Sequence, residues 1–152
     1  METSRKERAM NNFLQGYNCT QSILLAFEDF IPEQDKDAFI RMSSSFGGGM
    51  GRLREVCGSV SGMFLVAGLL DGYEGPETGQ IKADHYAKIQ ELAKRFEEKN
   101  GSIVCRDLLG LSEKRQPPTP EARTETYYKK RPCKEIVGMA AEILEQFIEE
   151  QQ

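Results

Sequence analysis

Apolar residues recur every three or four positions along most of this 152-residue chain, with polar residues between them. Such spacing places the apolar side chains on one face of a helix. The clearest stripe lies near the C-terminus, at Cys133, Val137, Ala140, Leu144 and Phe147. No segment keeps the two-residue alternation of a half-buried strand. The pattern therefore predicts an all-α protein.

The stops in the pattern divide the chain into about six helices. Glycine, proline and Asn-Gly close them, and polar caps begin them. We expect six main helices, at residues 1–15, 19–31, 34–44, 54–70 and 78–99 and from 132 onward. A further short helix is expected at 103–109. Residues 112–125 hold three prolines and many charges, so we expect an exposed connection there. The length suits one domain over residues 1–152, built as a helical bundle.

Composition narrows the function classes. The net charge of −4 argues against nucleic acid as a partner, because nucleic-acid binders usually carry a basic face. The most apolar segment, 56–70, is too short to span a bilayer, which needs about 20 residues. The opening residues are charged and lack the apolar run of a secretory signal. We therefore expect a cytoplasmic protein without a membrane span.

Four cysteines are the most informative residues, and each lies near the expected start of a helix. They are Cys19, Cys57, Cys105 and Cys133. A helix N-terminus carries a partial positive charge that favours the thiolate, the form that binds metal or attacks a disulfide. The intervals between them are long and contain no Cys-x-x-Cys, so the tertiary fold would have to gather them. A free cysteine can equally be a small buried apolar residue.

Glycines surround the second cysteine. Four of the five residues from 47 to 51 are glycine, and Gly58 directly follows Cys57. A glycine-rich stretch indicates left-handed backbone or close approach to a neighbour. Backbone N–H groups of Gly47, Gly48, Gly49 and Gly58 are candidate donors to a cofactor. Gly58 and Gly62 lie four positions apart, a spacing that lets a second helix come close.

These features together resemble a known family. The order and spacing of Asn18-Cys19, the glycine stretch 46–51, Cys57 with the glycines after it, Cys105 and Cys133 are similar to the redox-active family named for its pattern C…GCAxxG…C…C. The resemblance extends from Gly16 to the last helix. It implies a helical fold, a redox role and four functional cysteines.

Four thiolates without histidine fit an iron–sulfur cluster, or a closed tetrahedral zinc site as the second choice. Our leading interpretation is a small redox protein that binds a cluster through the four cysteines and exchanges single electrons with an unidentified partner protein. Arg52, Arg54 and Arg106 are candidates to offset the negative charge of the cluster.

Two other functions stay open, so the sequence does not decide whether the protein is an enzyme. The first is a thiol–disulfide redox enzyme with Cys57 as the attacking thiolate, because the neighbouring glycines leave room for a substrate. The second is a structural zinc-binding module that docks onto a partner. Exposed apolar edges on an acidic helical domain also make a homodimer a candidate assembly. His85, the only histidine, lies on the apolar stripe of its helix and is expected in the core.

Overall fold

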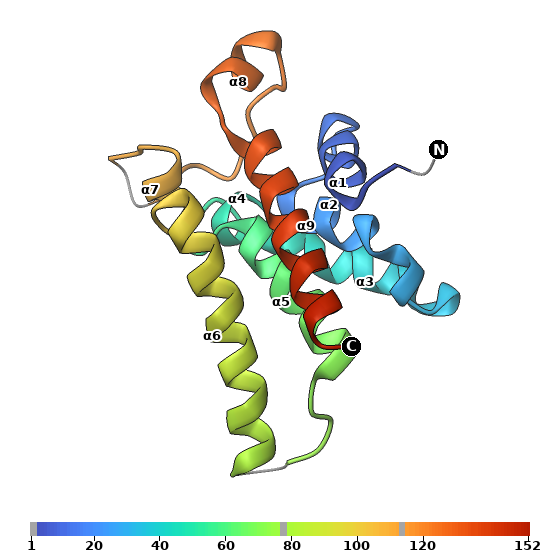
Figure 1. The fold of residues 1–152 in the computed structure, drawn as a ribbon. Helices are drawn as coiled ribbons and strands as arrows, with labels where there is room; N and C mark the ends of the chain where they lie inside the picture. Colours follow the sequence, from blue (N-terminus) through green and yellow to red (C-terminus); the bar gives the residue numbers. More distant parts are fainter. Residues whose placement is uncertain (1–2, 77–78, 113–114) are drawn as a thin grey trace.

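Six helices of eight or more residues make up most of the structure, a computed structural model (Figure 1). It describes residues 3–76, 79–112 and 115–152. The six are α1 (Arg5–Leu14), α2 (Cys19–Ala26), α3 (Lys36–Ser43), α5 (Gly58–Asp71), α6 (Gln80–Asn100) and α9 (Cys133–Glu150). Shorter elements are α4 (Gly47–Met50), α7 (Cys105–Leu108), α8 (Glu125–Lys130) and 3₁₀ turns at Glu28–Phe30, Glu33–Asp35 and Ser44–Phe46. The all-α prediction is confirmed. Within the described ranges, the only strand-like pairing is one antiparallel bridge between Val56 and Val104.

Helix α2 begins as the sequence predicts. The Asn18 side chain accepts a hydrogen bond from the Gln21 backbone at 2.8 Å, and the Gln21 side chain accepts one from the Asn18 backbone at 3.2 Å. This capping box satisfies two N–H groups that a helix start would leave unpaired. It fixes Cys19 as the first residue of the helix.

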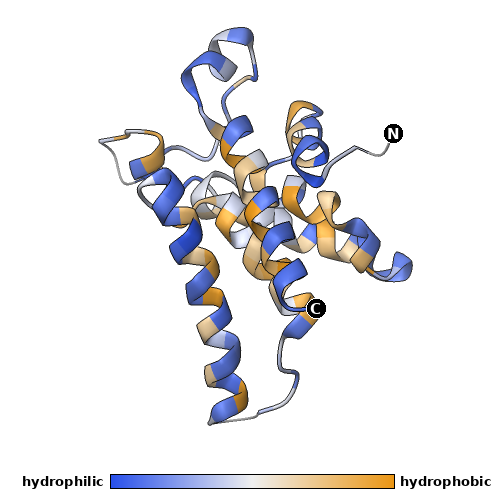
Figure 2. Cartoon of the chain, in the orientation of Figure 1, coloured by the Kyte–Doolittle hydropathy of each residue, from blue (hydrophilic) through white to orange (hydrophobic). Residues whose placement is uncertain are grey.

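The core lies where α2, α5 and α9 meet. Helix α1 packs on α9 and α2, and α6 packs on α5 and α9 from another side (Figure 1). Fully buried side chains from several helices fill the centre: Phe13, Ile23, Phe27, Val60, Met63, Val66, Leu92, Phe96, Val137 and Leu144. Figure 2 shows hydrophobic residues gathered on the central helices and a mostly hydrophilic outer face on α6. Burial of this apolar surface is the main force that holds the helices together.

Several details differ from the sequence prediction. Met42 on α3 and Ile81 at the start of α6 are 65% and 57% exposed, although the three-to-four-residue apolar spacing along 34–44 and 78–99 predicts that both are buried. Figure 1 shows the first turns of α6 extending beyond the body of the bundle, where no helix covers them. Helix α5 begins at Gly58 rather than near residue 54, and the short α8 was not predicted. The expected start of α6 at Thr78 lies outside the described residues.

Among the described residues, no helix combines the length and the apolar character needed to cross a bilayer.

Candidate functional site

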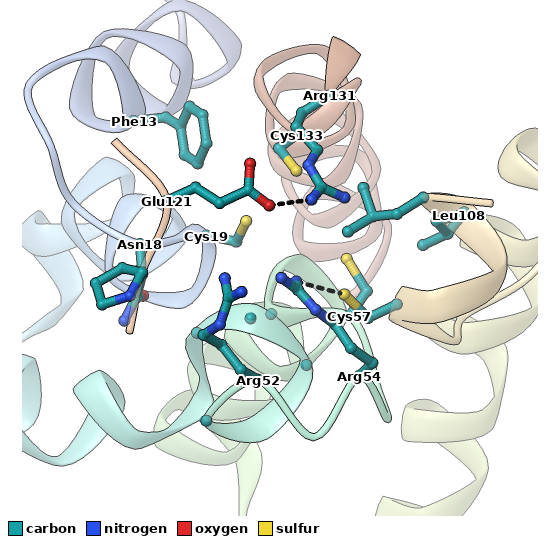
Figure 3. A pocket seen from close by; sticks show the side chains of 18 of the residues that line it. Phe13, Asn18, Cys19, Arg52, Arg54, Cys57, Leu108, Glu121, Arg131 and Cys133 are labelled. Atoms are coloured by element: carbon teal, nitrogen blue, oxygen red, sulfur yellow. Dashed lines mark hydrogen bonds and ion pairs between the residues drawn. The ribbon is translucent and has the colours of Figure 1, made fainter. Parts of the chain in front are cut away.

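All four cysteines line a single cavity of about 470 Å³ (Figure 3). Cys19, Cys105 and Cys133 are the first residues of α2, α7 and α9, and Cys57 immediately precedes α5. Cys57 and Cys105 are buried, whereas Cys19 and Cys133 are half-buried. The fold thus brings together every cysteine that the sequence separates.

Close packing of α5 against α2 brings Cys19 and Cys57 near each other. The hydroxyl of Thr20 donates to the carbonyl of Gly58 at 2.8 Å in a buried position. A Cβ added to Gly58 would lie 2.9 Å from the Cβ of Cys19, and one added to Gly62 would lie 2.7 Å from the Cβ of Ile23. Both distances are too short for a side chain. The spacing of the two glycines therefore serves the contact between α5 and α2.

Backbone hydrogen bonds hold the two buried cysteines, Cys57 and Cys105, near each other. The N–H of Cys57 donates to the carbonyl of Ile103 at 2.8 Å, and the N–H of Cys105 donates to the carbonyl of Glu55 at 2.6 Å. These bonds flank the bridge between Val56 and Val104. They hold the start of α7 beside the start of α5, although 48 positions separate the two cysteines.

The glycine-rich stretch forms one wall of the cavity. Gly47, Gly48, Gly49 and Gly58, the four predicted cofactor-contacting glycines, all line it. Gly48 and Gly49 have φ angles of 70° and 68°, in the left-handed region. A Cβ on Gly49 would lie 2.6 Å from the Cβ of Cys105. The sequence-based expectation of left-handed backbone and close approach is confirmed.

Arg54 is a buried arginine within this wall. It is 5% exposed and has a φ of 59°, a strained value for a residue with a side chain. Its Nη1 donates to the sulfur of Cys105 at 3.5 Å, and its Nε and Nη2 donate to Oε1 of Gln116 at 2.9 and 2.6 Å. Within the described ranges it forms no ion pair with a carboxylate. Its charge therefore acts mainly on the sulfur atoms around it.

Basic side chains outnumber acidic ones around the cavity. Four arginines line it, Arg52, Arg54, Arg123 and Arg131, together with one carboxylate, Glu121, which pairs with Arg131 (Figure 3). Arg106, a third predicted counter-charge, does not line the cavity and instead pairs with Glu55 at 3.4 Å. A positive cavity in a chain of net charge −4 favours negatively charged contents.

The polar segment between α7 and α8 closes part of the cavity. Arg52 Nε donates to the carbonyl of Pro117 at 2.7 Å. Arg123 donates to the carbonyls of Phe13 and Tyr17 and lies over the ring of Phe13, 4.1 Å from its centroid. Most side chains in 115–124 are exposed, but Pro118, Pro120, Glu121 and Arg123 line the cavity. Residues 113–114 of the expected connection lie outside the described residues.

The interaction between Cys19 and Cys133 shifts the pKa values of the two thiols in opposite directions. The Cys19 thiol hydrogen-bonds to the Cys133 sulfur, which raises the pKa of Cys19 well above its usual value and lowers the pKa of Cys133. The guanidinium charges of Arg131, Arg54 and Arg123 lower the pKa of Cys133 further. Cys133 is therefore the cysteine with the most thiolate character.

Cys57 has the opposite character. Burial raises the pKa of Cys57 to about 12, and burial also raises the pKa of Cys105, against the opposing effect of Arg54. The sequence pointed to Cys57 as the attacking thiolate because of the glycines next to it. Gly58 lets α2 pack closely beside Cys57, and the resulting burial disfavours the charged form.

Among the described residues, no group of three or more His, Cys, Asp or Glu side chains is arranged to hold a metal ion. The described residues also contain no disulfide, and all four cysteines are free thiols. The donor chemistry is nevertheless entirely thiol, which suits soft metal centres.

The comparisons with known proteins agree with this picture. A family model described as "Putative redox-active protein (C_GCAxxG_C_C)" matches residues 17–147. The chain belongs to this family. Neither the curated proteins nor the solved structures contain a match to it. The C_GCAxxG_C_C family is described as redox-active, and the matched range includes all four cysteines of the cavity.

Sequence reasoning missed several residues of the site. Arg123, Arg131 and Gln116 come from polar segments with no helical periodicity, and no spacing signal in the sequence marks Tyr127 as a site residue. Tyr127 lines the cavity, and burial raises its pKa to about 12. His85 is half-buried, lies edge-on to Tyr73 at 6.0 Å between ring centroids, and does not line the cysteine cavity.

Proposed function

We propose that the four cysteines hold one iron–sulfur cluster and that the protein exchanges single electrons through it. One observation supports this most: thiols from four separate helix starts all line the same cavity. Thiol–disulfide exchange needs two sulfur atoms, whereas [2Fe–2S] and [4Fe–4S] clusters take four cysteine ligands. A bundle with a purely structural role would have no reason to gather four thiols in one cavity, whereas a cluster requires all four.

The electrostatics of the cavity favour this ligand set. A cluster held by four thiolates is negatively charged, and bringing such charge into a protein interior requires compensation. Arg52, Arg54, Arg123 and Arg131 supply positive charge around the thiols against a single carboxylate. The buried Arg54 has no carboxylate partner in the described ranges, and the Cys105 sulfur beside it would supply the counter-charge once it is a cluster-bound thiolate.

A closed zinc site is the alternative metal centre for the same four thiols. The metal that the protein binds distinguishes the two.

The surrounding residues would control such a group. When bound, an iron–sulfur cluster accepts and releases one electron at a time. Cys19, Cys57, Cys105 and Cys133 would hold it, and the N–H groups of the glycine wall are candidate donors to its sulfur atoms. Phe13, Leu108 and Ile136 line the cavity and exclude water, while the arginines favour the more negative, reduced state.

Anaerobic reconstitution with iron and sulfide tests the proposal. We expect visible absorption from sulfur-to-iron charge transfer, with iron and sulfide bound in stoichiometric amounts. Cys57→Ser and Cys105→Ser should each reduce the bound iron to less than about one-fifth, because each removes a ligand. Colourless protein after reconstitution, or stoichiometric zinc in protein purified without added metal, would overturn the proposal.

A second function is supported by the Cys19–Cys133 pair. The Cys133 thiolate would attack a substrate disulfide and form a mixed disulfide while one substrate sulfur leaves as a thiol, taking up the proton from Cys19. The Cys19 thiolate would then attack the Cys133 sulfur, forming the Cys19–Cys133 disulfide and releasing the second substrate sulfur as a thiolate. The substrate disulfide is reduced by two electrons and the protein dithiol is oxidised by two.

Trapping variants separate this second function from the first. With Cys19→Ser, an aromatic disulfide reagent should leave a stable mixed disulfide at Cys133, visible by mass spectrometry. With Cys133→Ser, the same reagent should label the protein at least about tenfold more slowly, because the low-pKa thiolate is gone. Equal rates in the two variants would exclude Cys133 as the attacking residue.

A further inference from the structure

Charge is distributed unevenly along the chain. Residues 115–134 contain six basic and two acidic residues, a net charge of +4, whereas the whole chain carries −4. The remaining residues therefore carry a net charge of −8. Such an asymmetry marks one region of an acidic protein as a distinct electrostatic surface.

This basic region lies beside the cysteine cavity. Seven of its residues line the cavity: Pro118, Pro120, Glu121, Arg123, Tyr127, Arg131 and Cys133. Figure 1 shows α8 and its flanking loops projecting from the end of the molecule where α9 begins, next to Cys133. The basic surface and the proposed redox centre thus occupy the same end of the molecule.

Several of these charges are free to meet a partner. Arg115, Lys129 and Lys130 are exposed, and none of them has a carboxylate within 4.0 Å in the described ranges. We define the basic rim as Arg52, Arg115, Arg123, Lys129, Lys130 and Arg131. Of these six residues, only Arg131 pairs with a carboxylate in the described ranges, that of Glu121. Most of the positive charge of the rim is therefore uncompensated.

Exposed apolar side chains lie next to the cavity in the sequence. Leu14 follows the cavity-lining Phe13, Tyr17 precedes Asn18, and Leu53 lies between Arg52 and Arg54. Leu14, Tyr17 and Leu53 are 47%, 37% and 40% exposed. Apolar side chains together with charged ones are the usual composition of a transient protein interface.

The burial of the cysteines sets the direction of approach. Cys57 and Cys105 are buried, and only Cys19 and Cys133 are partly accessible. An electron donor or acceptor therefore comes closest to the sulfur atoms from the side of Cys19 and Cys133, where the basic rim lies.

We infer that the basic rim is the docking surface for an acidic redox protein, which exchanges electrons with the cysteine cavity. This inference rests on the proposed redox function of the cavity. Opposite charges on the two proteins accelerate their encounter and orient it, which suits a weak, short-lived electron-transfer complex. The apolar residues beside the cavity and the acidic remainder of the chain favour a protein partner over nucleic acid.

Equilibrium binding tests the docking surface without requiring a cluster. The probe is an acidic plant-type [2Fe–2S] ferredoxin, and basic cytochrome c serves as the probe of opposite charge. At about 20 mM ionic strength, the native protein should bind ferredoxin and release it as salt rises, because the Debye length shortens to about 8 Å at 0.15 M. Lys129→Glu with Lys130→Glu should weaken binding by at least about tenfold.

A charge-matched variant distinguishes the rim from net charge. Lys82→Glu with Lys94→Glu, both on α6 and outside the cavity lining, changes the net charge equally and should alter ferredoxin affinity less than about twofold. Equal losses in the two double variants would overturn the inference. So would absence of ferredoxin binding at low salt, stronger binding of cytochrome c than of ferredoxin, or displacement of bound ferredoxin by stoichiometric duplex DNA.

The iron content and visible spectrum of each variant keep the two proposals apart. Failure to form a cluster, with rim-dependent ferredoxin binding intact, would reject the cluster and leave the docking surface standing. A normal cluster with no rim-dependent binding would reject the docking surface alone.

Discussion

Arg54 directs its Nη1 toward the sulfur of Cys105, 3.5 Å away, from a backbone conformation that few residues other than glycine adopt. Holding a non-glycine residue in the left-handed region costs of order 1 kcal/mol or more. The same residue also carries a buried charge whose other hydrogen-bond acceptor is the neutral Gln116. Two unfavourable features are thus retained at one residue, which places a positive charge against a cavity sulfur.

Replacement of Arg54 should lower the reduction potential of the proposed iron–sulfur cluster. A positive charge stabilises the reduced state, because that state is more negative, so Arg54→Gln should make reduction harder. A hydrogen bond to a charged group contributes about 1.5–3 kcal/mol, and we expect a shift of roughly 60–130 mV for one electron. Redox titration followed by the visible spectrum measures it.

Arg106 supplies the control for this change. It belongs to the same neighbourhood but does not line the cavity and pairs with Glu55. Arg106→Gln removes the same charge and should shift the potential by less than about one-third as much. A shift of equal size in both variants would mean that total charge, rather than contact with sulfur, sets the potential.

Two neighbouring glycines should respond very differently to alanine. Gly49 and Gly51 have nearly equal φ angles of 68° and 67°, so the backbone strain is similar in both. A Cβ on Gly49 would lie 2.6 Å from the Cβ of Cys105, whereas one on Gly51 meets nothing nearer than 3.9 Å. Gly51→Ala should cost about 1–2 kcal/mol of unfolding free energy, and Gly49→Ala about 1–3 kcal/mol more.

Urea denaturation of the cluster-free protein gives both free energies. Similar losses in the two alanine variants would show that strain alone makes these glycines necessary. The contact of Gly49 with Cys105 would then have no energetic weight.

Local signals made the helices and their starts predictable. Asn18 and Gln21 form a capping pair that sequence spacing alone reveals, and Pro132 directly precedes α9. Each of these signals acts within one helical turn. Cys19 could therefore be placed correctly at the first position of its helix, and Cys105 and Cys133 within the first turn of theirs.

The remainder of the site depends on contacts between distant residues. The bond from Arg52 to Pro117 joins residues 65 positions apart, and Arg123 reaches Phe13 across 110 positions. Polar segments carry no periodicity that would indicate such partners. The burial of Cys57, which raises its pKa, likewise arises only when α2 packs against α5.

Two buried hydroxyls near Cys57 should have opposite effects on stability. Thr20 donates to the Gly58 carbonyl at 2.8 Å, so Thr20→Val keeps the shape but loses the bond and should cost about 1–2 kcal/mol. The hydroxyl oxygen of Ser59 is buried and has no partner in the described part of the chain. Ser59→Ala should therefore be neutral or stabilising by up to about 1 kcal/mol. Thermal or urea unfolding compares them, and a clear loss in Ser59→Ala would indicate an additional partner for that hydroxyl.

Alkylation of the reduced, cluster-free protein should rank the four thiols. At pH 7.5, iodoacetamide should modify Cys133 first and Cys57 last, because the rate follows the thiolate fraction and accessibility. Peptide mass spectrometry over time gives the individual rates, with an expected ratio of at least about tenfold. Cys19→Ala removes the hydrogen bond that lowers the pKa of Cys133, so Cys133 should react more slowly in that variant. Faster modification of Cys57 than of Cys133 would contradict the assigned protonation states.

The stability of the cluster-free protein should fall as pH rises above about 8.5. An unfolded cysteine loses its proton near that pH, whereas folded Cys57, with a pKa of about 12, keeps it. The folded state then binds more protons than the unfolded state, so the unfolding free energy decreases with pH, by up to about 1.4 kcal/mol per pH unit for this group. The loss should continue to about pH 12 and then level off.

Cys57→Ala should flatten the decline, whereas Cys133→Ala should not, because the folded pKa of Cys133 is lowered rather than raised. Urea unfolding at pH 8, 9 and 10 measures the slope, and an unchanged slope in Cys57→Ala would show that Cys57 does not remain protonated in the fold.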